Sequence, residues 1–362
     1  MHRPLSTDQF RPEIPVMRPR VPSTDSVIDR LRNIETSGWY TNFGPQVRQL
    51  ESRVEELVRA RPGTVVTAAS ATRALEGALA VSEERVWEAP SWTFSATIGA
   101  AVAAGATLRF VDIGHDDWWI ESRAPARLAV APFGAWSDPR ERLGPGELVI
   151  DGAAALGAVP DLSDLADDQA VVFSLGATKV LGAGEGGLAV FGDPQRARRF
   201  RAWTQHGFDG SRVSARAGTN AKMSEVAAAY AHAALDDWAR ERSEWNAARK
   251  GADRIVDELG LTRQPGVTAD PTPYWIVVLP DGRSRELVAT TLAEHGIATR
   301  RWWEGGCHRM PAYASIPRSD LGRTELAADA SLGLPFYRGI GEAELHRIAD
   351  ALDRARTIAG TW

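Results

Sequence analysis

Short apolar and β-branched runs alternate with Ala- and Leu-rich helical patterns in the first half of the chain. The runs occupy residues 64–67, 85–89, 107–112, 128–131, 148–151 and 170–174. Alternation of this kind is typical of βαβ units, so it predicts a mostly parallel sheet with helices on both faces. We therefore expect an α/β fold whose large domain has three layers, α/β/α.

The second half has a different pattern. Residues 221–258 have the periodicity of one long amphipathic helix, first Ala-rich and then rich in Arg and Glu. A strand-like run follows at 274–279, then a helical pattern at 284–295, a short run at 297–301 and a last helix at 341–358. We expect an extended N-terminal segment at 1–30 that packs on the small domain, a large domain at 31–245 and a smaller α+β domain at 246–362.

Composition narrows the class of protein. A net charge of −5 over 362 residues disfavours nucleic acid and anionic membranes as partners. The single cysteine, Cys307, excludes an intrachain disulfide and fits a cytoplasmic setting, and it leaves a free-thiol nucleophile as an open alternative. Residues 1–20 lack the apolar core of a signal peptide, and residues 96–106 are too short to span a bilayer. No metal site is predicted.

Ligands of open parallel sheets collect where strands end, so polar residues at these points are the first candidates. Ser70, Ala71 and Thr72 follow the run at 64–67 and open a helical pattern. Free N–H groups at a helix start bind phosphate well. An ordinary N-cap is the alternative for Ser70 or Thr72.

Two charged residues follow other strands. Asp151 ends the run at 148–151, where a carboxylate requires a cation or donor such as a protonated pyridinium nitrogen; the alternative is a turn aspartate. Lys179 comes shortly after the run at 170–174, and a lysine shielded from water is an amine nucleophile that condenses with aldehydes. An isolated lysine is otherwise a solvated surface residue.

Together, a phosphate site, a pyridinium partner and an aldehyde-binding lysine are what pyridoxal 5'-phosphate (PLP) requires of a protein. A competing motif is present, because Gly182, Gly184 and Gly187 match the G-x-G-x-x-G dinucleotide pattern. That fingerprint must open a helix, whereas residues 188–191 are strand-like, so we reject nicotinamide and flavin binding.

A series of ordered motifs extends over most of the chain. They are the segments 38–45 (GWYTNFGP), 50–51 (LE), 70–75 (SATRAL), 90–97 (PSWTFSAT), 110–113 (FVDI), 151–153 (DGA), 173–179 (FSLGATK), 184–187 (GEGG), 220–225 (NAKMSE) and 299–300 (TR). In these motifs the chain resembles the PLP-dependent sugar aminotransferases typified by DegT and StrS, which have the aspartate aminotransferase fold, PLP fold type I.

The resemblance assigns roles to particular residues. It implies that Lys179 carries PLP as a Schiff base and serves as general base and acid, and that Asp151 pairs with the pyridine nitrogen. Phe94 would stack on the ring, while Ser70, Ala71, Thr72 and Ser174 would hold the phosphate. Asn220 would complete the phosphate site of a neighbouring subunit, which implies a homodimer with shared active sites. Candidate contacts to the substrate are Tyr40, Thr41, Arg300 and His308.

The activity that the resemblance implies is transfer of an amino group from glutamate or glutamine to a ketosugar, most simply a nucleotide-linked one. A keto-inositol is an alternative acceptor. A sugar dehydratase of the same fold is disfavoured, because those relatives replace the lysine by His. A non-catalytic homologue stays open, since Ala154 stands where relatives have Gln or His near the cofactor's phenolic oxygen, and Gly176 where His is usual.

Overall fold

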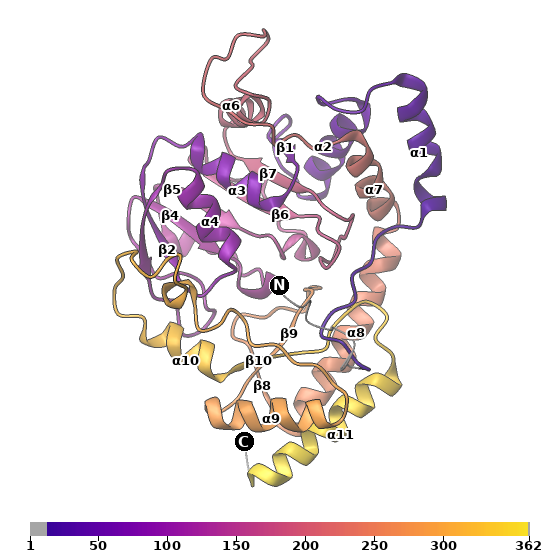
Figure 1. The fold of residues 1–362 in the computed structure, drawn as a ribbon, viewed down its shortest axis with the longest axis vertical. Helices are drawn as coiled ribbons and strands as arrows, with labels where there is room; N and C mark the ends of the chain where they lie inside the picture. Colours follow the sequence, from indigo (N-terminus) through magenta and orange to yellow (C-terminus); the bar gives the residue numbers. More distant parts are fainter. Residues whose placement is uncertain (1–12, 361–362) are drawn as a thin grey trace, which may run out of the picture.

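A seven-stranded sheet forms the centre of the large domain (Figure 1). The computed structural model describes residues 13–360. In spatial order the strands are β1 (Val65–Ala68), β7 (Gly187–Phe191), β6 (Gln169–Ser174), β5 (Glu147–Asp151), β4 (Ala126–Val130), β2 (Val86–Pro90) and β3 (Thr107–Val111). The pairs β6–β5, β5–β4, β4–β2 and β2–β3 are parallel, and only β7 runs antiparallel to both neighbours. The prediction of a mostly parallel sheet is confirmed.

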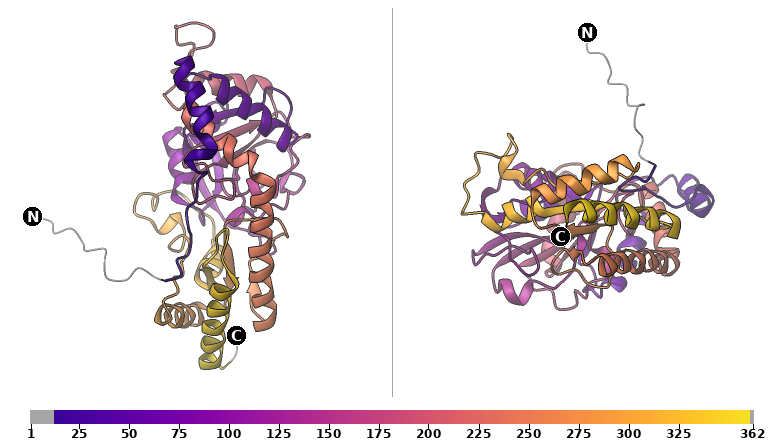
Figure 2. Two further views of the ribbon diagram at one scale, coloured as in Figure 1. Left: turned by 90° about the vertical axis from the view of Figure 1, so that its right-hand side faces the viewer. Right: turned by 90° about the horizontal axis from the view of Figure 1, so that it is seen from below.

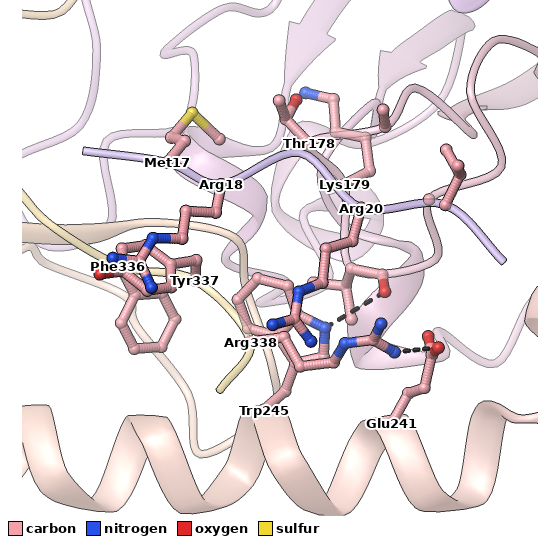
Figure 3. Close-up of a pocket in the computed structure, with 14 residues that line it drawn as sticks. Met17, Arg18, Arg20, Thr178, Lys179, Glu241, Trp245, Phe336, Tyr337 and Arg338 are labelled. Atoms are coloured by element: carbon pink, nitrogen blue, oxygen red, sulfur yellow. Dashed lines mark hydrogen bonds and ion pairs between the residues drawn. The ribbon is translucent and has the colours of Figure 1, made fainter. Parts of the chain in front are cut away.

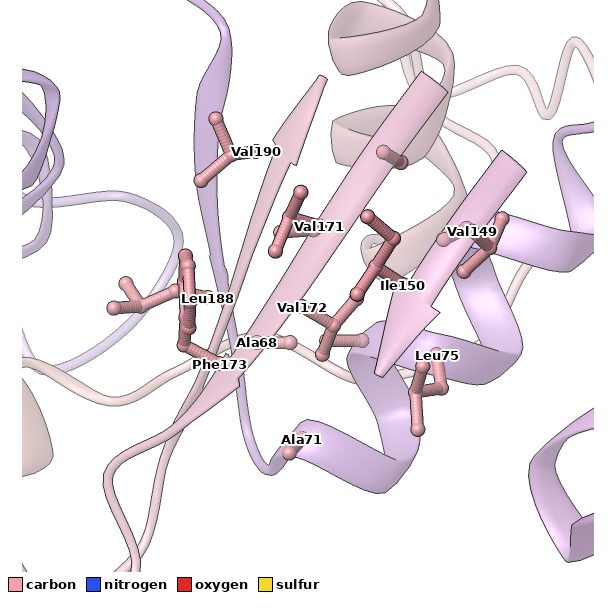
Figure 4. Packing of buried hydrophobic residues seen from close by; sticks show 14 of the residues in the cluster. Ala68, Ala71, Leu75, Val149, Ile150, Val171, Val172, Phe173, Leu188 and Val190 are labelled. Atoms are coloured by element: carbon pink, nitrogen blue, oxygen red, sulfur yellow. The ribbon is translucent and has the colours of Figure 1, made fainter. Parts of the chain in front are cut away.

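Helices cover this sheet. Helix α3 packs across β1, β7, β6 and β5, where Leu75 meets the buried side chains of the central strands (Figure 4). The helices of the large domain are α1 (Thr24–Ser37), α2 (Pro45–Leu57), α3 (Ala71–Ala80), α4 (Ser95–Ala103), α5 (Arg140–Leu143), α6 (Pro194–Thr204) and α7 (Glu225–Asp236). Because β1, β5 and β6 are parallel, their carboxyl ends lie at one edge of the sheet.

The long helix expected at 221–258 is two helices, so that prediction is wrong in detail. Helix α7 ends at Asp236 and α8 (Trp238–Leu259) begins directly after Asp237. The Ala-rich helix α7 packs on α1 and α2, whereas α8 places Trp245 and Ile255 in a second hydrophobic core. The chain turns at Asp237 because the two apolar faces serve different cores.

The second core belongs to the C-terminal part of the chain. It lies between a small antiparallel sheet and helices α8, α9 (Gly282–Glu294) and α11 (Glu342–Ala359) (Figure 1). The sheet has the order β10 (Ser331–Leu334), β9 (Trp275–Val278) and β8 (Thr262–Arg263), and α10 (Gly322–Ala330) precedes β10. The run at 297–301 forms no strand, only single bridges from Ile297 to Ile14 and from Arg300 to Gly333.

Residues 13–22, here called the strap, run extended between the two domains (Figure 2). Ile14 exchanges backbone hydrogen bonds with Gly296 and Ala298, and Val16 accepts one from Phe336. At the other end, the amide of Arg20 donates to the carbonyl of Ala177 at 3.0 Å. The strap therefore links the small domain to the segment that carries Lys179.

The expected extended segment 1–30 is shorter in the structure, because Ser23 caps α1 and the helix begins at Thr24. Its first part, residues 1–12, lies outside the described residues. No helix within residues 13–360 combines the length and the apolar character needed to cross a membrane.

Candidate active site at the carboxyl edge of the sheet

A cavity of about 490 Å³ opens at the edge where β1, β5 and β6 end. Its wall combines the turn before α3, the ends of β5 and β6, the strap and residues from the small domain. The volume lies within the range of ~300–1,000 Å³ that is usual for small-molecule sites. The sequence-predicted residues that line this cavity are Ser70, Ala71, Thr72, Phe94, Asp151, Ser174, Lys179 and Arg300.

One side of the cavity is suited to an anion. Ser70 is the N-cap of α3, and its hydroxyl accepts a hydrogen bond from the amide of Arg73. The amides of Ala71 and Thr72 lie in the first turn, where no intrahelical acceptor exists, and they add the positive end of the helix dipole. The hydroxyl of Ser174, at the end of β6, faces the same cavity.

Gly187 allows the close approach that builds this turn. A Cβ atom at position 187 would lie 2.3 Å from the carbonyl oxygen of Ser70 and 2.6 Å from the amide of Ala71. Gly187 also begins strand β7 rather than a helix, so the rejection of the dinucleotide fingerprint is supported by the fold.

Asp151 is a buried carboxylate in the cavity wall. One oxygen accepts a hydrogen bond of 2.6 Å from the Thr97 hydroxyl, and the other accepts one of 3.0 Å from the amide of Ala153. Burial raises the pKa of the Asp151 carboxyl, while these hydrogen bonds and the charge of Lys179 act against the rise. Such a group favours a cationic partner within the cavity.

Lys179 lies in a turn after β6 and directs its amine into the same cavity. Its backbone amide donates to the carbonyl of Gly176 at 2.8 Å, which fixes the turn. Its Nζ atom lies 3.3 Å from the hydroxyl of Tyr274 and 5.6 Å from the centre of that ring. Tyr274 was not among the predicted site residues, because it precedes a small-domain strand far from the recognised motifs.

Aromatic side chains form the outer wall of the cavity. Phe94, directly before α4, lines the cavity and leaves 59 % of its surface exposed. Phe133 and Trp303 stack with their ring centres 4.7 Å apart. The guanidinium of Arg300 lies 4.6 Å from the centre of the Trp302 ring. Together with Tyr274, these side chains form an aromatic wall that presents ring faces and edges to a sugar or base.

Four predicted residues do not line this cavity. Tyr40 and Thr41 are exposed in the loop between α1 and α2. Asn220 lies at the base of the hairpin 205–220, where it accepts a hydrogen bond of 2.7 Å from Lys222. His308 is buried behind the cavity wall, between the Ser91 hydroxyl and Glu325. Its contacts are those of a packing residue, and its role at the substrate stays a prediction that this geometry does not support.

A smaller cleft of about 20 Å³ adjoins Lys179 on the far side of the strap (Figure 3). Its wall carries Arg18, Arg20 and Arg338, and Arg338 is paired with Glu241 of α8. The cleft is far smaller than the main cavity, so the main cavity is the candidate for the ligand.

The thiol alternative is not supported. Cys307 is fully buried, and burial raises the pKa of its thiol to about 12. A reactive cysteine requires a low pKa and access to solvent, and Cys307 has neither.

The residues present fit PLP. An amine that binds aldehydes, a buried carboxylate that favours a cation and a helix start that favours an anion line one cavity of suitable size. These correspond to the aldehyde, the ring nitrogen and the phosphate of that molecule.

Comparison with known proteins agrees with this geometry. A model of the DegT/DnrJ/EryC1/StrS aminotransferase family matches residues 23–133 and 147–353. The erythromycin biosynthesis sensory transduction protein EryC1 of Saccharopolyspora erythraea is 30 % identical over 346 residues, covering 88 % of this chain and 92 % of the relative. A UDP-N-acetyl-3-dehydro-alpha-D-glucosamine 3-aminotransferase of Acidithiobacillus ferrooxidans is 28 % identical, and the match covers 86 % of this chain and 89 % of the relative.

Among solved structures, DesI in the presence of its TDP-sugar product is 30 % identical to this chain. The superposition has a TM-score of 0.81 and covers 99 % of this chain and 97 % of DesI. The predicted fold class, a three-layer large domain with a smaller α+β domain of PLP fold type I, is thereby confirmed.

Proposed function

The chain belongs to the DegT/DnrJ/EryC1/StrS aminotransferase family, and from this premise we propose that it transfers an amino group from glutamate or glutamine to a nucleotide-linked ketosugar. The observation that carries the proposal is the shared cavity of Lys179, Asp151 and the turn before α3. Relatives whose names specify dTDP-linked or UDP-linked sugars support the class of acceptor.

PLP supplies an aldehyde that binds amines covalently and a ring that accepts electrons from the bond being broken. Ser70, Thr72 and Ser174, with the first amides of α3, would hold the phosphate. The carboxylate of Asp151 would keep a proton on the ring nitrogen, and Phe94 would cover one face of the ring.

Lys179 has two tasks in this proposal. Between turnovers, its Nζ atom would bind the aldehyde carbon of the cofactor. During turnover, it would take a proton from the α-carbon of the donor and return it to the former aldehyde carbon. Both tasks require an amine shielded from bulk water, which the strap and the aromatic wall provide. The wall also offers stacking surface to the acceptor.

The test uses the small number of lysines in the chain, namely Lys179, Lys222 and Lys250. Purified protein with added PLP should absorb near the edge of the visible range, and borohydride reduction should attach the cofactor to the Lys179 peptide alone. Lys179→Ala should abolish both signals and transamination, whereas Lys250→Ala, on the exposed face of α8, should leave them unchanged. Normal turnover by Lys179→Ala would refute the proposal.

The acceptor and the donor are then determined by the half-reactions. Glutamate and glutamine should each be tested for loss of the visible band, followed by dTDP- and UDP-linked 3-keto and 4-keto hexoses and a keto-inositol. A band that no amino donor changes would favour the non-catalytic homologue. Turnover with the keto-inositol alone would replace the nucleotide-sugar assignment.

We also propose a homodimer in which Asn220 serves the partner's phosphate site. Asn220 does not line its own cavity, and it lies at the base of the hairpin 205–220, which projects from the large domain (Figure 1); both observations support the proposal. Mixing two inactive variants, Lys179→Ala and Asn220→Ala, should restore activity, because each heterodimer then has one site with both residues intact. No recovery after exchange of subunits would contradict the shared site.

A further inference from the structure

The proposed reaction needs an amine at position 179 that exchanges its proton during the cycle. Within residues 13–360, the hydroxyl of Tyr274 is the side-chain hydrogen-bond partner recorded for that amine, at 3.3 Å. We propose that Tyr274 is a further catalytic residue, whose hydroxyl holds the Lys179 amine in both of its protonation states. The inference rests on the proposed function and extends it to the small domain.

A phenol hydroxyl suits this task because it both donates and accepts. When the amine carries three protons, one N–H donates to the oxygen of Tyr274. When the amine has given up one proton, the O–H of Tyr274 donates to its free electron pair. The phenol keeps its own proton throughout, so the proton count of the reaction is unchanged. A carboxylate in the same place would instead favour the charged amine alone.

The ring of Tyr274 is held firmly enough to direct its hydroxyl. It packs edge-on against Phe133, with centres 5.7 Å apart, and against Trp302, with centres 5.1 Å apart. Its backbone carbonyl accepts hydrogen bonds from Thr272 and Arg249. The position of the hydroxyl is therefore set by packing from both domains, from Phe133 of the large domain and from Trp302 of the small domain.

The other titratable groups of the cavity do not replace Tyr274. Asp151 acts on Lys179 through its charge, but both of its oxygens are already engaged by Thr97 and Ala153. Glu185 is exposed, and the guanidinium of Arg300 stacks on Trp302. Ala154, also in the cavity wall, carries only a methyl group.

The main test measures the amine directly, without bound cofactor. Reductive methylation of the apo-protein with formaldehyde over a range of pH, read out by peptide mass spectrometry, reports each of the three lysines separately. A hydrogen bond to a charged amine is stronger than one to a neutral amine, so Tyr274→Phe should speed the labelling of Lys179 about 3- to 10-fold. Lys222 and Lys250 serve as internal controls.

Tyr313→Phe is the matched control. It removes the same hydroxyl from a tyrosine outside the cavity, whose partner is the carbonyl of Ser95 at 3.4 Å. This variant should leave all three labelling curves unchanged. Because Phe keeps the ring that packs on Phe133 and Trp302, Tyr274→Phe should unfold at nearly the wild-type temperature.

Turnover gives the second measurement. Tyr274→Phe loaded with PLP should keep its visible band but react with glutamate about 10- to 100-fold more slowly. Tyr274→His should recover part of the rate, because its ring also donates and accepts hydrogen bonds. A Tyr274→Phe protein with wild-type labelling and wild-type rate would overturn the inference and leave the proposed function intact. A wild-type protein without transaminase activity would remove the proposed function, while the labelling would still test the contact.

Discussion

Replacing Asp151 by Asn should stabilise the apo-protein and weaken its hold on PLP. Asn has the same shape, and the neighbouring hydroxyls can turn to accommodate it. The amide oxygen keeps the hydrogen bond from Ala153, and the amide NH₂ donates to Thr97, which then donates to Thr93, 2.8 Å away. No buried polar group is left without a partner, so the main change is the loss of a buried charge.

The sign of the stability change follows from the pKa of Asp151, which burial raises above the ordinary value of 3.8. The native carboxyl holds its proton to a higher pH than the unfolded one, so stability falls as the pH rises from about 4 through the native pKa. Each unit by which the native pKa exceeds the unfolded pKa lowers the free energy of unfolding by about 1.4 kcal/mol at neutral pH. Removing the charge recovers this cost, and about 1 kcal/mol raises the melting temperature of a chain this long by about 2 °C.

The effect on the cofactor has the opposite sign. A charge-assisted hydrogen bond in a buried site contributes about 1.5–3 kcal/mol, so PLP should bind about 10- to 100-fold more weakly to Asp151→Asn. Calorimetry of the apo-protein at pH 7.5 and pH 4 measures the first effect, which should shrink at the lower pH. Titration of the visible band with PLP measures the second.

Asp112→Asn is the control for the stability change. Burial alone would raise the pKa of the Asp112 carboxyl, but hydrogen bonds from Thr324, Arg323 and Ile113 outweigh it and lower the pKa. Its replacement should therefore destabilise the protein at pH 7.5 and leave PLP binding unchanged. The reasoning about Asp151 is refuted if its Asn variant melts lower than wild type at pH 7.5 or binds PLP as tightly.

Three further outcomes are expected. Burial lowers the pKa of both His232 and His308 below 6.5, so their contribution to stability should be complete above pH 6.5 and should be lost as the pH falls through that value, by up to about 2.7 kcal/mol per pH unit. His232→Gln should halve this contribution to the slope of stability against pH, measured by urea unfolding. The buried carboxylate of Glu225 accepts hydrogen bonds from two amides at the start of α2, at 2.7 and 3.1 Å. Glu225→Gln should therefore lower the free energy of unfolding by about 1.5–3 kcal/mol in denaturant titrations, and unchanged stability would contradict this role. Gly187→Ala should displace the Ser70 turn and raise the dissociation constant of PLP more than tenfold, whereas a wild-type constant would show that the turn tolerates the methyl group.

The parts of the site that the sequence predicted are those that depend on strand ends. The run before Asp151 and the run before Lys179 each form a parallel strand within one or two residues of the expected bounds. Carboxyl ends of parallel strands share an edge, so the meeting of these side chains with Ser70 follows from local patterns alone. The motifs shared with a known family added Phe94 and the expected dimer.

The small domain was predicted only in part: Arg300 was expected from a family motif and lines the cavity, whereas Tyr274 was not expected. Tyr274 reaches the cavity through tertiary packing, and its spacing from Lys179 along the chain carries no signal. The same holds for Thr97, which binds Asp151 from a neighbouring helix. The break at Asp237 was missed because helical periodicity does not show which core each apolar face will join.

The strap has a consequence for biosynthesis. Its partners Gly296, Ala298 and Phe336 leave the ribosome only after the whole of the large domain has been made. The large domain has its own core and can condense earlier, as N-terminal domains generally do during translation. We therefore expect Met17 and Pro19 to join the cavity wall only after the small domain has been made, so that a nascent chain exposes the Lys179 amine after its large domain has condensed.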